Sequence, residues 1–101
     1  MIIETTLIKL RKGVDRNDVM ALYEKTAASW AANPDLIEKY YYFDPTNGEG
    51  GGVYFWPDRS AAEKWHGADY RRMVADIYGS EPRIRIFDAL MHVGPAGVKQ
   101  L

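Results

Sequence analysis

The fold is decided by the stretch Gly50-Gly51-Gly52-Val53-Tyr54-Phe55-Trp56-Pro57-Asp58, in which a glycine run opens directly into an aromatic strand. Glycine lets the backbone approach a bulky group closely, and the aromatic side chains that follow indicate a cavity wall. A phosphate-binding loop joins a strand to a helix, whereas this run joins two expected strands. We therefore expect a β-hairpin with a bulge at Gly51 and Gly52, which positions Tyr54 and Trp56 on one sheet face.

The rest of the chain alternates between strand and helix periodicity. Strands are expected at residues 2–10, 36–43, 52–56 and 82–93, followed by a tail at 94–101. One helix is expected between the first two strands, and a second, divided at Gly67, between the last two. The order β-α-β-β-α-β predicts an α+β, ferredoxin-like domain. Its four-stranded antiparallel sheet would carry the helices on one face.

The ends of the helices carry recognisable signals. Asp15 is expected to cap the first helix, and Asn33-Pro34 to end it. Asp58 or Ser60 is expected to cap the second helix, because Ser60 and Glu63 have the spacing of a capping box. The buried stripe of the first helix is expected to consist of Val19, Tyr23, Ala27 and Trp30.

The composition limits the classes of function. With 101 residues, 47% of them hydrophobic, residues 1–101 should form a single domain that buries roughly 65% of its unfolded surface. The net charge of -1 and the scattered basic residues argue against nucleic acid or a membrane as a partner. Cysteine is absent, and two separated histidines are too few for a metal centre, so we expect no metal and no thiol nucleophile. The start of the chain has no leader-like segment, which makes a cytoplasmic protein the expectation.

Both faces of the expected sheet carry apolar residues. In the last strand, Ile84 and Ile86 lie on one face and Phe87 and Met91 on the other. Helices cover only one face of this fold, so the second face needs another cover. We therefore expect a homodimer formed by sheet-to-sheet packing.

Several segments resemble a known family when they are taken together. They are Asn33-Pro34, Lys39 within the 36–41 segment, the 51–56 strand, Tyr78-Gly79-Ser80-Glu81-Pro82 and Ile86-Phe87-Asp88. Over about residues 36–93 the chain resembles the YdhR-type monooxygenases of the dimeric α/β-barrel superfamily, which includes the antibiotic-biosynthesis monooxygenases. The resemblance implies a homodimer with an elongated pocket between sheet and helices in each subunit. It also implies cofactor-free oxidation of a phenolic or polyketide-like aromatic substrate.

Three residues are candidates for catalysis. His66 follows Trp65 near the break between the two helical pieces, where it is either a solvated helix-end residue or a general base. Tyr54 is either core or a hydrogen-bond donor to the substrate oxygen. Arg85 is either a solvated strand charge or the group that stabilises an anion.

Other residues are candidates for binding a flat aromatic ligand, although each also has a purely structural interpretation as core or surface. The candidate pocket walls and substrate-binding residues are Lys39, Trp56, Trp65, Tyr70 and Phe87. The chemistry that we expect is deprotonation of an electron-rich aromatic substrate followed by its reaction with oxygen, with no cofactor. The alternatives are a non-oxidative isomerase, lyase or cyclase, and a small-molecule-binding dimer without turnover.

Haem degradation is disfavoured. Trp65 falls where the haem-degrading members of this superfamily have a helix tryptophan. However, Ala75 lies near the place of their iron-ligating histidine, and the first strand has no asparagine.

Overall fold

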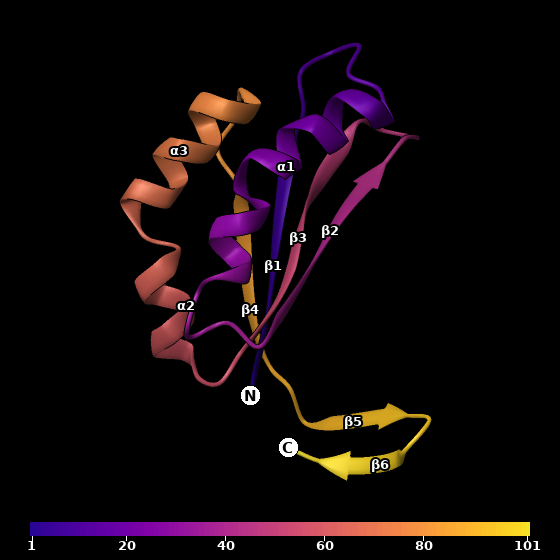
Figure 1. The fold of residues 1–101 in the computed structure, drawn as a ribbon, viewed down its shortest axis with the longest axis vertical. Helices are drawn as coiled ribbons and strands as arrows, with labels where there is room; N and C mark the ends of the chain where they lie inside the picture. The colour runs from indigo at the N-terminus through magenta and orange to yellow at the C-terminus, as the bar shows by residue number, and fades with distance from the viewer.

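In a computed structural model that describes residues 1–101, three helices lie on one face of a four-stranded antiparallel sheet (Figure 1). The strand order is β2-β3-β1-β4. The elements are β1 (Ile2–Lys9), α1 (Arg16–Ala31), β2 (Glu38–Asp44), β3 (Glu49–Trp56), α2 (Arg59–Trp65), α3 (Ala68–Tyr78), β4 (Arg83–Asp88), β5 (Met91–Gly94) and β6 (Gly97–Gln100). The predicted ferredoxin-like α+β fold is confirmed, and Gly67 separates α2 from α3 as expected.

The first helix begins where the sequence predicts. The Asp15 side chain accepts from the backbone N–H of Asp18 at 2.9 Å, and the Asp18 carboxylate accepts from the backbone N–H of Asp15 at 3.1 Å. Its expected buried stripe is only partly correct, because Ala27 is exposed. At about 100° per residue, Ala27 is turned by about 80° from Val19, whereas Trp30 returns to within about 20° of it.

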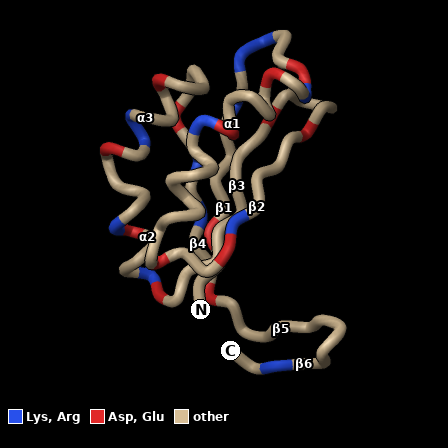
Figure 2. The backbone as a smooth tube through the Cα atoms, viewed as in Figure 1, with Lys and Arg blue, Asp and Glu red and all other residues tan.

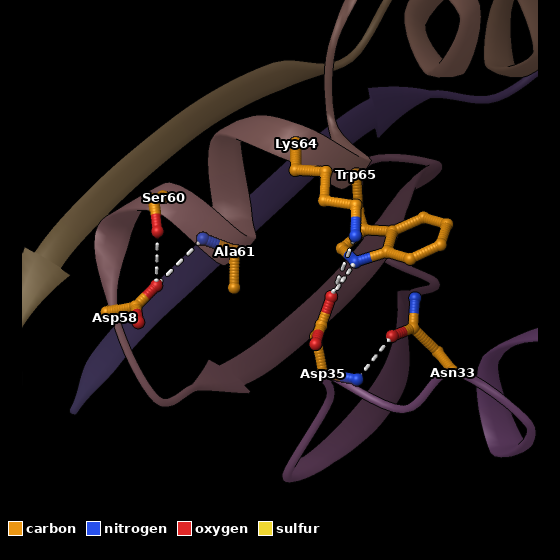
Figure 3. Close-up of polar contacts among 7 residues, drawn as sticks. All are labelled: Asn33, Asp35, Asp58, Ser60, Ala61, Lys64 and Trp65. Carbon is orange, nitrogen blue, oxygen red and sulfur yellow. Dashed lines mark hydrogen bonds and ion pairs between the residues drawn. The ribbon is translucent and has the colours of Figure 1, made fainter.

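The second helix is capped by Asp58 and not by Ser60 (Figure 3). The Asp58 carboxylate accepts from the backbone N–H of Ala61 at 2.9 Å and from the Ser60 hydroxyl at 2.8 Å. These two bonds hold the first turn of α2, so the proposed Ser60–Glu63 capping box is wrong.

The glycine run belongs to β3 itself, and the predicted bulge is wrong. Both registers run through it without a shift, with Leu7 opposite Gly51 on one side and Tyr42 opposite Gly51 on the other. Instead, the glycines allow neighbouring groups to lie close to the backbone of β3. A side chain on Gly51, where φ is 151°, would collide with the carbonyl of Thr6, and one on Gly50 would collide with the Tyr23 hydroxyl.

The inner face of the sheet, toward the helices, is set by the alternation of β1. Ile2, Glu4, Thr6 and Ile8 are buried, while the residues between them are partly exposed. A first apolar cluster joins Ile8 to α1 and α3, and a second joins Ile2 to β3 and α2. The buried acid Glu4 therefore lies beside the second cluster.

The C-terminal region differs from the prediction of one long strand and a tail. β4 ends at Asp88, which is opposite Ile2 at the start of β1, so no partner strand continues beyond it. The chain then forms a β5–β6 hairpin through Gly94 and Gly97, which projects from the body of the domain (Figure 1). The hairpin and its flanks expose five large apolar side chains, namely Leu90, Met91, Val93, Val98 and Leu101.

The charged residues are distributed over helices, loops and strand ends (Figure 2). Acidic and basic positions are interspersed along α2 and α3, and the β5–β6 hairpin has a single lysine or arginine. None of the helices has the length and apolar character needed to cross a membrane.

Candidate functional site

The candidate site centres on a buried contact between an acid and a histidine. Glu4, on the inner face of β1, is fully buried, and the His66 side chain is 1% exposed. Nδ1 of His66 contacts Oε1 of Glu4, which also accepts a hydrogen bond from the Trp56 indole N–H at 2.8 Å. His66 reaches this position as the residue that caps the C-terminal end of α2, where its backbone N–H still donates to the carbonyl of Ala62. Strand alternation and a helix end thus bring together residues 62 positions apart.

The polar atoms of this pair are incompletely satisfied within the chain. Neither Oε2 of Glu4 nor Nε2 of His66 has a hydrogen-bond partner, and the Nδ1 contact is not aligned as a hydrogen bond. A buried polar atom without a partner costs about 1–3 kcal/mol, so native proteins rarely keep one without a reason. The free atoms of Glu4 and His66 are available to accept or donate a proton.

Aromatic rings surround the imidazole of His66 on several sides. Its ring centroid lies 4.0 Å from that of Tyr70, 4.4 Å from that of Tyr54 and 5.4 Å from that of Trp30. The hydroxyls of Tyr54 and Tyr70 are 3.2 Å apart. Burial raises the pKa of both tyrosines, so they remain neutral phenols near neutral pH. The site therefore offers a hydrogen-bonded pair of hydroxyls, in which one hydroxyl donates to the other, beside a histidine and a carboxylate.

Lys39 brings an amine to the same region from β2. Its Nζ lies 3.7 Å from the ring centroid of Tyr41, 4.4 Å from that of Tyr54 and 4.7 Å from that of Trp30. Burial lowers the pKa of Lys39 from 10.5 to about 7, and the charge of Glu4 opposes this shift only in part. The amine is consequently present in both protonation states near neutral pH.

The space between sheet and helices is narrow. It encloses a cavity of about 10 Å³, which is enough for one water molecule. A groove of about 670 Å³ lies outside, between α1 and β2. Lys39, Tyr41 and Tyr23 line both spaces, so their side chains separate the interior from the groove.

Five of the predicted site residues lie together in the structure, and they come from β2, β3, α2 and α3. They are Lys39, Tyr54, Trp56, His66 and Tyr70. Trp65 lies at the surface side of α2, where its indole N–H donates to Asp35 at 2.8 Å (Figure 3). It does not face the histidine site.

Arg85 and Phe87 lie on the opposite face of the sheet. Arg85 is opposite Thr5 and Phe87 is opposite Ile3, and both of these β1 residues point away from the helices. The Arg85 guanidinium lies 4.9 Å from the Phe87 ring centroid, and both side chains are exposed. The structure thus does not bring Arg85 to the site of His66 and Tyr54, because adjacent residues of a strand point to opposite faces.

Glu4 and Trp30 are the site residues that the sequence prediction missed. Trp30 was expected only as core, although it contacts His66, Tyr54 and Lys39 together. The sequence does contain a feature that indicates the burial of Glu4. It is the single carboxylate in the buried phase of the first strand, between Ile2 and Ile8.

The comparisons with known proteins concern the fold. No protein-family model and no curated protein matches this chain. Among solved structures, that of Rv0793 from Mycobacterium tuberculosis covers 92% of this chain and 98% of its own, with a TM-score of 0.69 and 15% identity. An antibiotic biosynthesis monooxygenase covers 89% of this chain and 99% of its own, with a TM-score of 0.69 and 18% identity.

A third solved structure agrees with these two. It is a protein from Bordetella bronchiseptica that is named for antibiotic biosynthesis monooxygenase activity without that activity being established. It has a TM-score of 0.67 and 14% identity to this chain. It covers 88% of this chain and 96% of its own. At such low identities the similarity concerns the fold alone. The chain thus has the ferredoxin-like α+β fold of structures named antibiotic biosynthesis monooxygenase.

Proposed function

We propose that this chain is a cofactor-independent monooxygenase for a phenolic or polyketide-like aromatic substrate. The observation that carries the proposal is the buried Glu4–His66 pair, whose free polar atoms lie among aromatic rings. The fold shared with antibiotic biosynthesis monooxygenases supports it, as does the resemblance of residues 36–93 to the YdhR-type family. The cytoplasmic location expected from the sequence stays a prediction.

His66 acts as the general base in this proposal, and Glu4 orients it. The carboxylate lies against Nδ1, where its negative charge attracts the imidazolium that forms when Nε2 accepts a proton. The Tyr54 hydroxyl donates a hydrogen bond to the oxygen of the deprotonated substrate and accepts one from the Tyr70 hydroxyl, which lies 3.2 Å away. Arg85 has no part in these steps, since it lies on the other sheet face.

The oxidation itself needs only the substrate and oxygen. Deprotonation yields an electron-rich anion, which passes one electron to O₂. The radical pair combines to a peroxide anion at the ring carbon, which takes back the proton held by His66 to become a hydroperoxide. Loss of water from the hydroperoxide leaves a quinone. Overall, one substrate and one O₂ give one quinone and one water, so no other reductant is required.

In this proposal the substrate enters from the groove between α1 and β2. The enclosed cavity of about 10 Å³ cannot hold an aromatic ring, whereas the groove of about 670 Å³ has the size of a ligand site. We therefore propose that the Lys39 and Tyr41 side chains rotate toward solvent, which joins the two spaces. His66 lines neither space, so the proposal also includes a shift of Tyr54 and Tyr70, which line the cavity and contact His66.

We also propose that a second copy of the chain covers the outer sheet face. Tyr40 is 61% exposed and Phe87 38% exposed on this face, and the projecting β5–β6 hairpin adds further apolar surface. Sedimentation analysis should show a dimer for the native chain and a monomer for Phe87→Glu combined with Tyr40→Glu. A native chain that sediments as a monomer would contradict this proposal.

Oxygen uptake with hydroxylated anthrones and naphthols tests the enzymatic proposal. We expect His66→Ala to lower the rate about a hundredfold or more and Tyr54→Phe to lower it about tenfold. His92→Ala is the matched control, because His92 is exposed on β5 and should leave uptake unchanged. Circular dichroism verifies that each variant is folded. Equal uptake by the native chain and both site variants would overturn the residue roles, and product formation without oxygen would favour a non-oxidative reaction.

A further inference from the structure

The Lys39 side chain is half-buried and has no salt-bridge partner. It forms no salt bridge, whereas the other lysine that lies over a tryptophan, Lys64, pairs with Asp35 at 3.4 Å. Lys39 instead lies among the faces of Trp30, Tyr41 and Tyr54. An amine in such surroundings loses hydration and gains no carboxylate contact.

The backbone makes room for this arrangement. A side chain on Gly52 would come within 2.9 Å of Cε of Lys39 and within 2.9 Å of the Tyr54 ring. The absence of a side chain there lets the lysine lie across β3 toward the helices. Because Lys39 lines both the inner cavity and the groove between α1 and β2, its amine is reachable from the groove.

The groups around Lys39 leave it with a substantial free-amine fraction. The tyrosines that face the cavity from α1, β2, β3 and α3 stay neutral near pH 7, because burial raises the pKa of each; they are Tyr23, Tyr41, Tyr54, Tyr70 and Tyr78. The charged group that acts on Lys39 is Glu4, which itself contacts His66. Burial lowers the pKa of Lys39 to about 7, and the charge of Glu4 opposes part of that shift.

We infer that Lys39 is a carbonyl-reactive residue, which binds an aromatic aldehyde or ketone reversibly as an imine at the inner end of the groove. In this step the neutral amine adds to the carbonyl carbon, forming the C–N bond, and loss of the carbonyl oxygen as water leaves a C=N bond. No oxidant or reductant is consumed. The aromatic lining from Trp30, Tyr41 and Tyr54 favours a flat aromatic group on the carbonyl. The inference shares its cavity with the proposed function, but it does not depend on oxygen chemistry.

Reductive trapping tests this inference directly. The native chain is treated with benzaldehyde and cyanoborohydride at about pH 7, and the benzylated lysines are identified by peptide mass mapping. At that pH Lys39 carries on the order of a thousandfold more free amine than an exposed lysine. We expect Lys39 to be labelled at least about tenfold faster than Lys64, with partial burial offsetting the rest. Equal or slower labelling of Lys39 would overturn the inference.

Two variants and a denatured control exclude simpler explanations. Lys39→Met should remove the fast label and Lys64→Met should retain it, and in urea both lysines should react at the same rate. Gly52→Ala, which fills the space beside Cε of Lys39, should slow the reaction at Lys39 alone. Acetaldehyde tests the ligand class, since an equal preference for Lys39 with this aliphatic aldehyde would overturn the aromatic part of the inference. Fast trapping in a chain that consumes no oxygen would leave the inference intact and contradict the proposed function.

Discussion

Two clusters in this chain combine an indole, a carboxylate and a basic side chain, one inside the domain and one at its surface. Inside, Trp56 donates to Glu4 at 2.8 Å beside His66. At the surface, Trp65 donates to Asp35 at the same distance beside Lys64 (Figure 3). The two hydrogen bonds have the same length, so the clusters differ in how far water reaches them and not in the bond itself.

The two clusters differ in their access to water. The side chains of Asp35 and Lys64 are 36% and 64% exposed, so solvent can hydrate each group whenever its partner moves away. Glu4 and His66 have no such alternative, and three of their polar atoms have no hydrogen-bond partner in the chain. The same chemical groups therefore serve local structure at the surface and create reactive, unsatisfied positions in the interior.

The largest difference between the clusters should appear when each indole is removed. Trp56→Phe deletes the donor to a buried carboxylate and leaves a cavity, so we expect a loss of about 3 kcal/mol in the free energy of unfolding. Trp65→Phe deletes the donor to Asp35, which water can replace, and should cost much less. Urea unfolding of both variants measures the difference. Equal losses would show that the surface cluster is as strongly desolvated as the interior one.

The sequence predicts the elements that build the interior cluster, but it does not identify all of its members. The glycine-aromatic stretch correctly places Tyr54 and Trp56 on one face, and the break at Gly67 correctly places His66 at a helix end. Glu4 was missed because a carboxylate on a strand normally faces solvent. Its position within the buried phase of β1 would have identified it.

Arg85 shows a different kind of limit. Both phases of β4 carry apolar residues, with Ile84 and Ile86 in one and Phe87 in the other, so hydrophobicity alone does not select the phase that faces the helices. The narrow cavity could not be predicted either. Its size depends on how Lys39 and Tyr41 are placed against α1, and sequence periodicity does not determine side-chain conformations.

An effect of intermediate size is expected in the pH dependence of the free energy of unfolding. It should distinguish Lys39 from Lys64, the two lysines that lie over indoles. Burial lowers the pKa of Lys39 from 10.5 to about 7, so between these pH values the unfolded chain binds more protons than the folded chain. The free energy of unfolding should therefore rise with pH in this window, by at most about 1.4 kcal/mol per pH unit. Lys39→Met should remove this rise, whereas Lys64→Met should preserve it.

Urea unfolding at a series of pH values measures these slopes. The buried tyrosines act in the opposite direction above about pH 10, because burial raises the pKa of Tyr23 from 10.0 to about 12 and the unfolded chain then loses protons first. The difference between the native chain and Lys39→Met cancels this contribution. Parallel curves for the two proteins would contradict a perturbed Lys39.

The smallest effect is expected where a carboxylate is neutralised at the surface. The hydrogen bond from Trp65 and the neighbouring Lys64 lower the pKa of Asp35, but this exposed group is well hydrated with or without them. Asp35→Asn should thus change the urea midpoint little, and about 0.5 M salt should reduce the change further by screening. Glu4→Gln is the matched interior change, and its effect should be larger and insensitive to salt, since buried charges are screened much less. A midpoint shift for Asp35→Asn that equals that of Glu4→Gln and persists in salt would show that burial does not separate the two clusters.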